Sequence, residues 1–127
     1  MADFAGRVAL AAMFIISGAA KLFGHTAETV QYMESYGVPV ARVLVYPAGL
    51  AELLAAVALA VGFHGRIAAL VLALYTVVVT PIFHAFWAVP PDQAMLQMLL
   101  FTKNVAIFGG LLYVAAHGSG RFARKRD

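Results

Sequence analysis

The segment 93–117 (QAMLQMLLFTKNVAIFGGLLYVAAH) constrains the fold most, because it is long and apolar yet carries a lysine near its middle. A helix of about 20 apolar residues spans the hydrocarbon core of a bilayer, so this segment is expected to cross a membrane. Lys103 and Asn104 must then face protein or water, since a lysine at that depth costs about 2.5–3.5 kcal/mol. Glu52 is the acidic residue that lies inside another apolar segment. We therefore expect Glu52 and Lys103 to form an ion pair.

The composition of the chain identifies it as an integral membrane protein. Of its 127 residues, 63% are hydrophobic and 12% are charged, whereas about 25% of the residues in a soluble domain are charged. At about 20 residues per helix, the chain holds four membrane-spanning helices with short connections, which form a single membrane domain. The first apolar run is too long for a signal-peptide core and is treated as a retained helix. We expect spans at residues 4–23, 40–63, 66–87 and 93–117, followed by a basic tail at residues 118–127.

The longest connection, residues 25–38, is expected to form a short helix at the membrane interface. Thr26 is a suitable N-cap, Gly37 is a suitable left-handed C-cap, and Pro39 blocks continuation of the helix. This helix either only connects the first two spans or also covers a pocket. The sequence thus predicts an all-α fold, an up-down-up-down bundle of four membrane-spanning helices with an interfacial helix between spans 1 and 2.

The distribution of lysine and arginine predicts the orientation of the chain in the membrane. With four spans, the two termini lie on the same side, which collects Arg7, Arg66, Arg121, Arg124, Lys125 and Arg126. The opposite side carries most of the acidic residues of the connections. Because cytoplasmic segments are enriched in lysine and arginine, we expect both termini to be cytoplasmic.

The polar side chains of the spans are predicted to gather in the outer half of the bundle. The second and fourth spans both descend from the outer face, so Glu52 and Lys103 lie level, at roughly 15 Å of helical rise. The first and third spans ascend, so the polar residues near their ends belong to the outer third. We predict a pocket that is open outward and closed below. Its candidate ligand-binding residues are Glu52 and Lys103 at the floor, Lys21 and His84 on the walls, and Asn104 and Gln97 as hydrogen-bonding groups.

More than one interpretation of these residues stays open. Glu52 and Lys103 can be a mutually neutralised pair that only fixes which helices are neighbours, and Lys21 can extend its long side chain to the head-group layer. Donors in excess of one pair favour ligand binding, and their positive balance favours an acidic or carbonyl-bearing ligand. In that case His84 can pass a proton to a quinone oxygen.

Several classes of function are excluded by the residues that the sequence lacks. There are no cysteines, which rules out disulfides, thiolate metal sites and a dithiol relay within this chain. The histidines show no metal-ligand spacing, so no metal site is predicted. No nucleotide-binding loop or haem motif appears, and the basic residues lie at helix ends, as orientation signals do. We therefore expect no resident redox cofactor and no nucleic-acid partner.

The order and spacing of several short motifs resemble the DoxX family over nearly the whole chain. The matching positions are 18–22 (GAAKL), 32–34 (YME), 37–39 (GVP), Glu52, 62–63 (GF), Arg66, 83–84 (FH), 86–87 (FW), Met98, 103–104 (KN) and 109–110 (GG). This family consists of small bacterial four-helix proteins of the inner membrane. Its name-giving relatives are linked to a thiosulfate:quinone oxidoreductase, and a mycobacterial relative is linked to a complex with superoxide dismutase and a sulfurtransferase. The resemblance implies an inner-membrane subunit in redox or sulfur metabolism that contacts quinone, and it carries over no catalytic residues.

The leading hypothesis is a membrane subunit of an oxidoreductase system that binds a quinone or a small organic acid in the outer pocket. One alternative is permeation of a small anion or proton, which would require polar lining in the inner half. Another alternative is a structural anchor that recruits soluble redox enzymes through the basic tail or the interfacial helix. The sequence assigns no catalytic reaction, and it leaves a homo-oligomer open.

Overall fold

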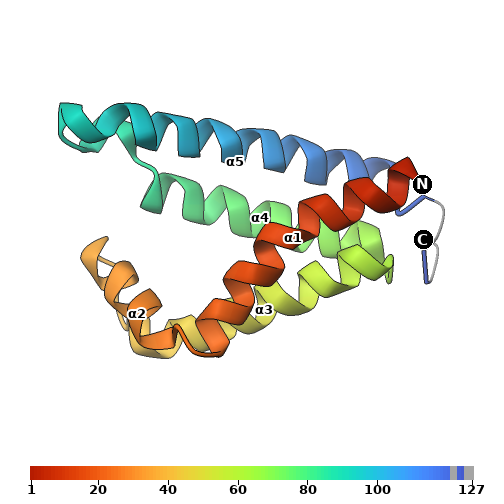
Figure 1. The fold of residues 1–127 in the computed structure, drawn as a ribbon, viewed down its shortest axis with the longest axis horizontal. Helices are drawn as coiled ribbons and strands as arrows, with labels where there is room; N and C mark the ends of the chain where they lie inside the picture. The colour runs from red at the N-terminus through yellow and green to blue at the C-terminus, as the bar shows by residue number, and fades with distance from the viewer. Residues whose placement is uncertain (121–122, 125–127) are drawn as a thin grey trace.

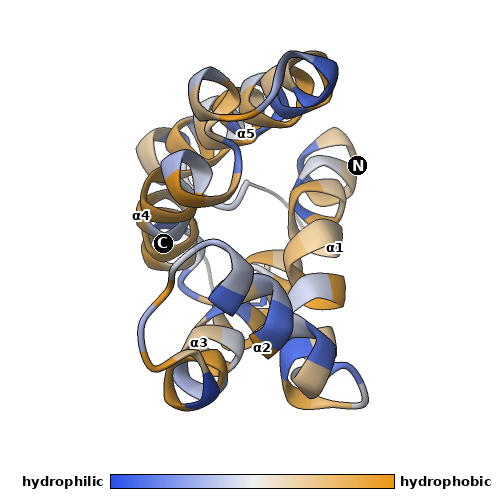
Figure 2. Ribbon diagram, turned by 90° about the vertical axis from the view of Figure 1, so that its left-hand side faces the viewer, coloured by the Kyte–Doolittle hydropathy of each residue, from blue (hydrophilic) through white to orange (hydrophobic). Residues whose placement is uncertain are grey.

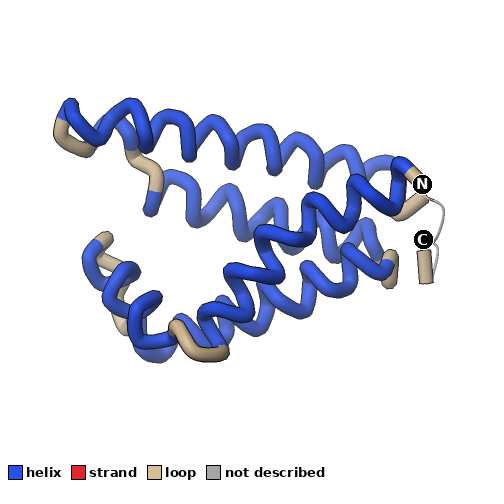
Figure 3. The backbone as a smooth tube through the Cα atoms, viewed as in Figure 1, coloured by secondary structure: helices blue, strands red, loops and turns tan. Residues whose placement is uncertain are grey.

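The computed structural model of the chain describes residues 1–120, 123 and 124. Within these residues the chain is all-helical, as predicted (Figure 1, Figure 3). The elements are α1 (Ala2–Leu22), α2 (Thr26–Ser35), α3 (Ala41–Val61), α4 (Gly65–Phe83), η1 (Phe86–Ala88) and α5 (Pro91–His117). Four of these helices are long and apolar enough to cross a membrane: α1, α3, α4 taken together with η1, and α5. The short helix expected between the first two spans is α2.

The third span agrees with the predicted range 66–87 to within one residue at each end, whereas the fourth span begins before its predicted range 93–117. The α-helix of the third span stops at Phe83, and a short 3₁₀ turn follows it. Pro81 removes a backbone hydrogen bond from the last turn of this helix, which weakens its continuation. The fourth span starts earlier than predicted, at Pro91, because a proline in the first turn needs no partner for an N–H. Residues 121–122 and 125–127 of the predicted basic tail lie outside the described residues.

The spanning helices form two pairs that approach each other at one end and diverge at the other (Figure 1). α1 packs along α3, α4 packs along α5, and a tight turn after α3 leads into α4. Below, the half of the bundle that contains the N terminus and this turn is called the closed half. The half that contains α2 is called the open half. α1 and α5 meet in the closed half, where Leu10 lies against Gly110.

The α1–α3 pair is close because each helix presents a glycine to the other. A Cβ atom at Gly18 would lie 2.9 Å from the backbone nitrogen of Leu53, and one at Gly49 would lie 2.8 Å from the Cβ of Lys21. Small residues of this kind let two helix backbones approach each other within a membrane. The close approach places the side chain of Lys21 beside the face of α3 that also carries Glu52, three residues after Gly49.

The closed half is filled by packed apolar side chains. The buried core residues there are Ala11, Phe14, Ala56, Leu59, Ala68, Ala69, Leu72, Ala73 and Leu111. Arginines bind the carbonyl groups at the helix ends, which have no partner within their own helix. The buried Arg7 donates to the carbonyls of Leu59 at 3.2 Å and Ala60 at 2.9 Å, and Arg66 donates to the carbonyl of Ala116 at 2.8 Å. These contacts tie α1 to the end of α3, and α4 to the end of α5.

Candidate functional site

The open half encloses a cavity of about 560 Å³ between the two diverging helix pairs. All five α-helices contribute to its walls, and most of the lining side chains are apolar. Figure 2 views the molecule from the open end, where the hydrophilic helix α2 lies in front of the more hydrophobic spanning helices. Among the predicted site residues, those that line the cavity are Glu52, Lys103, Lys21, His84 and Asn104. Gln97 instead contacts His84 through a hydrogen bond.

The charged floor of the cavity is an ion pair between Glu52 and Lys21, so the predicted pairing of Glu52 with Lys103 is wrong. The Nζ atom of Lys21 lies 2.7 Å from Oε2 of Glu52 and also donates to Oγ of Ser17 at 2.7 Å. The hydroxyl of Tyr75 donates to the same carboxylate oxygen at 3.1 Å. The side chains of Glu52 and Lys21 are only 2% and 12% exposed. Glu52 and Lys103 line the same cavity, but α3 and α5 belong to different helix pairs, whereas α1 packs directly on α3.

Lys103 lines the cavity from α5, and its side chain is exposed. Within the described part of the chain, its ammonium forms no ion pair or hydrogen bond. An ammonium in the middle of a membrane-spanning helix is expensive unless a counter-charge, a carbonyl or water reaches it. Lys103 is therefore the cation in this cavity that is most available to an acidic or carbonyl-bearing ligand.

Asn104 connects α5 to α4 in the wall of the cavity. Its Nδ2 donates to Oγ1 of Thr80 at 3.1 Å, and that hydroxyl donates to the carbonyl of Thr76 at 2.6 Å. Bonds from a threonine hydroxyl to the carbonyl four residues earlier are common in helices. The side chain of Asn104 is 6% exposed, and its Oδ1 atom has no hydrogen-bond partner within the described part of the chain.

His84 belongs to a chain of hydrogen bonds that joins α4, α5 and α2. Its Nδ1 lies 2.9 Å from Oε1 of Gln97, and Nε2 of Gln97 donates to the hydroxyl of Tyr36 at 3.3 Å. Because a carbonyl oxygen only accepts, Nδ1 of His84 carries a proton in this arrangement. The other ring nitrogen, Nε2, is then the atom of His84 that is left for a ligand. Gln97 on α5 thus fixes the orientation of the His84 ring through this hydrogen bond.

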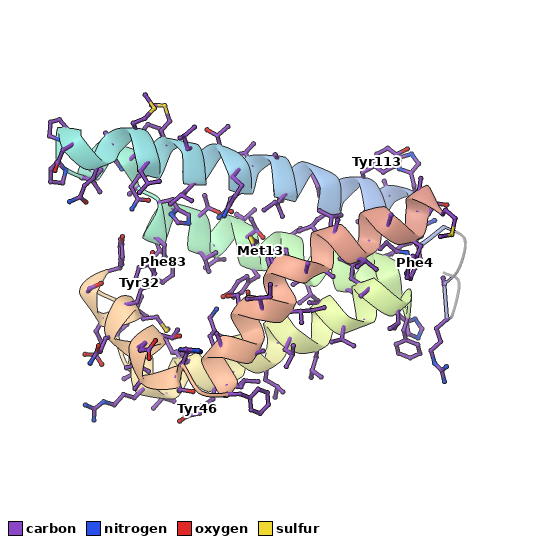
Figure 4. The ribbon with its side chains drawn as sticks, in the orientation of Figure 1. Phe4, Met13, Tyr32, Tyr46, Phe83 and Tyr113 are labelled. Atoms are coloured by element: carbon purple, nitrogen blue, oxygen red, sulfur yellow. The ribbon has the colours of Figure 1, made fainter. Side chains whose placement is uncertain are left out.

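α2 covers the open end of the cavity, which is the second of the two roles considered for this helix. Tyr32 stacks on Phe83 at the end of α4, with ring centroids 5.3 Å apart, and Tyr36 meets the same ring edge-on at 5.3 Å (Figure 4). Val30 and Met33 are buried against α3. Burial and the neighbouring hydroxyl of Tyr36 raise the pKa of Tyr32 to about 12. Tyr32 and Met33 also line the cavity.

Three tyrosines belong to this site that were not predicted from the sequence. Tyr75 binds the buried carboxylate of Glu52, Tyr32 lines the cavity, and Tyr36 holds the amide of Gln97. A signal for Tyr75 was present: tyrosines of membrane proteins concentrate at the interfaces, whereas this tyrosine lies in the middle of its span. No comparable signal marks Tyr32 and Tyr36, because tyrosine is ordinary in an interfacial helix.

The polar groups of the cavity are hydrogen-bonding and charged side chains rather than metal ligands. Within the described residues, no cluster of three or more histidine, cysteine, aspartate or glutamate side chains could hold a metal ion. The cavity offers an ion pair, an additional ammonium, an imidazole nitrogen and an amide oxygen. Such groups can orient a small molecule and exchange a proton with it.

Comparisons with known proteins agree with this architecture. Residues 2–85 match the model of the DoxX family. The chain belongs to the DoxX family. It is 35% identical over 120 residues to the inner membrane protein YphA of Escherichia coli (strain K12), an alignment that covers 94% of this chain and 85% of the relative. It is also 34% identical over 125 residues to the inner membrane protein YqjF of the same organism, covering 94% of this chain and 86% of the relative. No solved structure matches the chain.

The family and the fold together assign the location of the protein. Its relatives are inner-membrane proteins, and four of its helices have the length and apolarity of membrane spans. This DoxX-family chain is therefore a multi-pass protein of the inner membrane. The exposed apolar residues of its spanning helices face lipid.

Proposed function

We propose that this DoxX-family protein binds a quinone in the cavity of its open half and serves as a membrane subunit of an oxidoreductase system. The observation that carries the proposal is the cavity itself, about 560 Å³ in volume with a buried ion pair at its floor. Ligand sites typically measure about 300–1,000 Å³ and combine apolar walls with a few placed polar groups. The link to an oxidoreductase system rests on the resemblance to the name-giving relatives.

The surplus of polar groups favours ligand binding over mere packing of the helices. One buried ion pair is enough to fix which helices are neighbours, and Lys21 and Glu52 already supply it. Lys103 and His84 also line the cavity without belonging to that pair. The ammonium of Lys103 can donate to a ring carbonyl. Because Nδ1 of the neutral His84 ring donates to Gln97, its Nε2 can accept a proton from a ring hydroxyl.

The rim of the cavity favours a quinone over the alternative occupant, a small organic acid. Leu44 on α3, together with Val78 and Ile82 on α4, lines the cavity. These side chains are also 39%, 59% and 41% exposed, at positions within membrane-spanning helices. The cavity therefore opens toward the hydrocarbon region between α3 and α4. An amphiphile with an apolar tail fits this opening, because its tail can remain in the bilayer, whereas a small acid would have to cross hydrocarbon.

The closed half argues against the alternative of solute permeation. Below the cavity, the described core around Phe14, Leu59 and Leu72 is built from apolar side chains, and the buried Arg7 beyond it is bound to the carbonyls at the end of α3. A path for an anion or proton would need polar lining there. We further propose that the closed half faces the cytoplasm, since Arg7 and Arg66 lie at its end and lysine and arginine mark cytoplasmic segments.

The experiment that tests the proposal is native mass spectrometry with solvent extraction of the protein purified in a mild detergent. Wild type is expected to retain a quinone, and Glu52→Gln is expected to lose it, because a neutral amide at this position cannot hold the ammonium of Lys21 in place. Lys103→Met leaves the ion pair intact and is expected to retain less quinone than wild type. The matched control is Thr102→Val, one residue away on α5 and outside the cavity lining.

The measurement distinguishes the proposed function from its alternatives. Retention of quinone by wild type and by Thr102→Val, but not by Glu52→Gln, supports the quinone site. An organic acid in place of quinone would contradict the choice of ligand. Wild-type protein that is folded and carries neither molecule, even after addition of quinone, would leave the ion pair as a packing device and favour the anchor hypothesis.

A further inference from the structure

The amide of Asn104 has a fixed orientation that leaves its oxygen as an acceptor. The hydroxyl of Thr80 has a single proton, and the carbonyl of Thr76 takes it at 2.6 Å. Oγ1 of Thr80 can therefore only accept from Asn104, at 3.1 Å, so the atom of Asn104 that faces Thr80 must be the nitrogen. The hydroxyl of Thr76 is likewise committed to the carbonyl of Leu72 at 2.8 Å.

The free atom of this amide, Oδ1, is buried and lacks a donor within the described residues. A buried carbonyl oxygen without a hydrogen bond is costly, and most such groups in proteins are paired. Asn104 lines the main cavity, and it also lines a second cavity of about 290 Å³ behind it. Thr80 lines only the second cavity. Because Nδ2 is turned toward Thr80, Oδ1 is the atom of the Asn104 amide that remains for a ligand in the main cavity.

The chemistry of Asn104 complements that of the other polar groups. Lys21 and Tyr75 both donate hydrogen bonds to Glu52. The ammonium of Lys103 is also a donor, so it binds acceptors. These donors do not discriminate in favour of a ligand that donates, and the other acceptor that lines the cavity, Nε2 of His84, belongs to a different helix, α4. An amide oxygen does discriminate in this way, because it accepts from a hydroxyl and is left unpaired by an ether or a carbonyl at the same position.

From this geometry we propose that Asn104 selects an amphiphile with a ring hydroxyl for the main cavity. The inference rests on the proposed function and adds the form of the ligand: a hydroxyl-bearing ring is preferred over its methyl ether, and a hydroquinone over the corresponding quinone. The hydroxyl donates to Oδ1 of Asn104, the opposite oxygen of the ring accepts from a donor such as Lys103, and the tail leaves between α3 and α4. No chemical change of the ligand is required for this preference.

The test compares a donor and a non-donor ligand that share one apolar tail. The probes are 4-decylphenol and 4-decylanisole, titrated into wild-type protein in lipid nanodiscs and measured by native mass spectrometry. Phenol binding is expected to be roughly threefold to tenfold tighter than anisole binding, the range that one net hydrogen bond supplies. In Asn104→Leu the two dissociation constants are expected to become equal. Decyl-substituted hydroquinone and benzoquinone are expected to show the same preference in the same variants.

A matched variant separates selection from helix packing. Both Asn104→Leu and Thr80→Val remove the hydrogen bond between α5 and α4, so both carry the same structural loss. Thr80→Val keeps the amide oxygen but releases its orientation, so it is expected to keep a reduced preference for the phenol, whereas Asn104→Leu is expected to lose the preference. If Thr80→Val loses the preference completely, or if Asn104→Leu keeps it, the inference is wrong.

The remaining outcomes also decide the question. Equal binding of phenol and anisole to wild type would overturn the inference while leaving the proposed quinone site standing. Tighter binding of the quinone than of the hydroquinone would have the same effect. If folded wild-type protein binds none of the four probes, both the inference and the proposed function fail.

Discussion

The two halves of this bundle use the same four helices in opposite ways. In the closed half, side chains such as Leu59 and Leu72 are fully buried in a continuous apolar core, and Arg7 and Arg66 bind the carbonyls of helix ends. In the open half, the helix pairs diverge around a cavity of about 560 Å³. The closed half has the continuous core that stabilises the fold, whereas the open half places a buried ion pair beside a cavity.

We expect that replacing a leucine of α3 by alanine lowers the free energy of unfolding much more in the closed half than at the rim of the cavity. Leu59→Ala removes a fully buried side chain of the closed half and is expected to lower the free energy of unfolding by about 2–5 kcal/mol. Leu44→Ala removes a side chain that is 39% exposed at the rim of the cavity, and a cost of less than about 1 kcal/mol is expected. Unfolding by SDS in mixed micelles measures both. Similar losses would contradict the division into two halves.

Removing one partner of the ion pair in the open half is expected to destabilise the protein more than removing both partners. Lys21→Met leaves the carboxylate of Glu52 buried without its cation, and a loss of about 3–5 kcal/mol is expected. The double variant Lys21→Met/Glu52→Gln removes both charges and is expected to be more stable than Lys21→Met alone. Lys103→Met is the control, with an expected change below about 1 kcal/mol, because Lys103 is not the ion-pair partner. Additive effects of the two substitutions, seen in the same SDS titration, would refute the coupling.

The hydrogen bond that attaches α2 to the rest of the open half is expected to contribute less to stability than the ion pair does. Tyr36→Phe removes the hydrogen bond from Gln97 but keeps the ring that meets Phe83. A loss of about 1 kcal/mol is expected, which corresponds to roughly fivefold faster hydrogen exchange of the α2 amides. Tyr46→Phe, at an exposed tyrosine of α3, serves as the control and should leave this exchange unchanged. Unchanged exchange in Tyr36→Phe would show that ring packing alone holds α2.

The smallest expected effect is a pH dependence of the same attachment. The pKa of Tyr32 is raised in the folded protein from its usual value of 10.0 to about 12, chiefly by burial. The stabilisation from neutral Tyr32 is therefore fully present below pH 10 and is lost as the pH rises through about 12. Absorbance of tyrosinate, taken as the difference between wild type and Tyr32→Phe, should show its step near pH 12. A step at pH 10 would mean that Tyr32 is neither buried nor in contact with the hydroxyl of Tyr36.

Much of the site was predictable from the sequence because depth in a membrane follows from helical rise. The sequence placed Glu52, Lys103, Lys21, His84 and Asn104 in one half of the bundle, and all of them line the same cavity. Their binding of a ligand stays a prediction. Depth did not reveal which side chains touch, since the rotation and pairing of helices depend on packing. The predicted partner of Glu52 was therefore wrong, and its contact with Tyr75 was not predicted.

The sequence by itself determined that the described chain is helical, that four of its helices can span a membrane, and that several polar residues lie in the same half of the bundle. Those properties follow from the lengths of apolar runs and from a rise of about 1.5 Å per residue, which are local. Only the tertiary structure decided the ion pair and the opening of the cavity. Gly18 and Gly49 let α1 pack closely on α3, so Lys21 forms the ion pair with Glu52. Lys103 lines the cavity from α5 and remains available to a ligand.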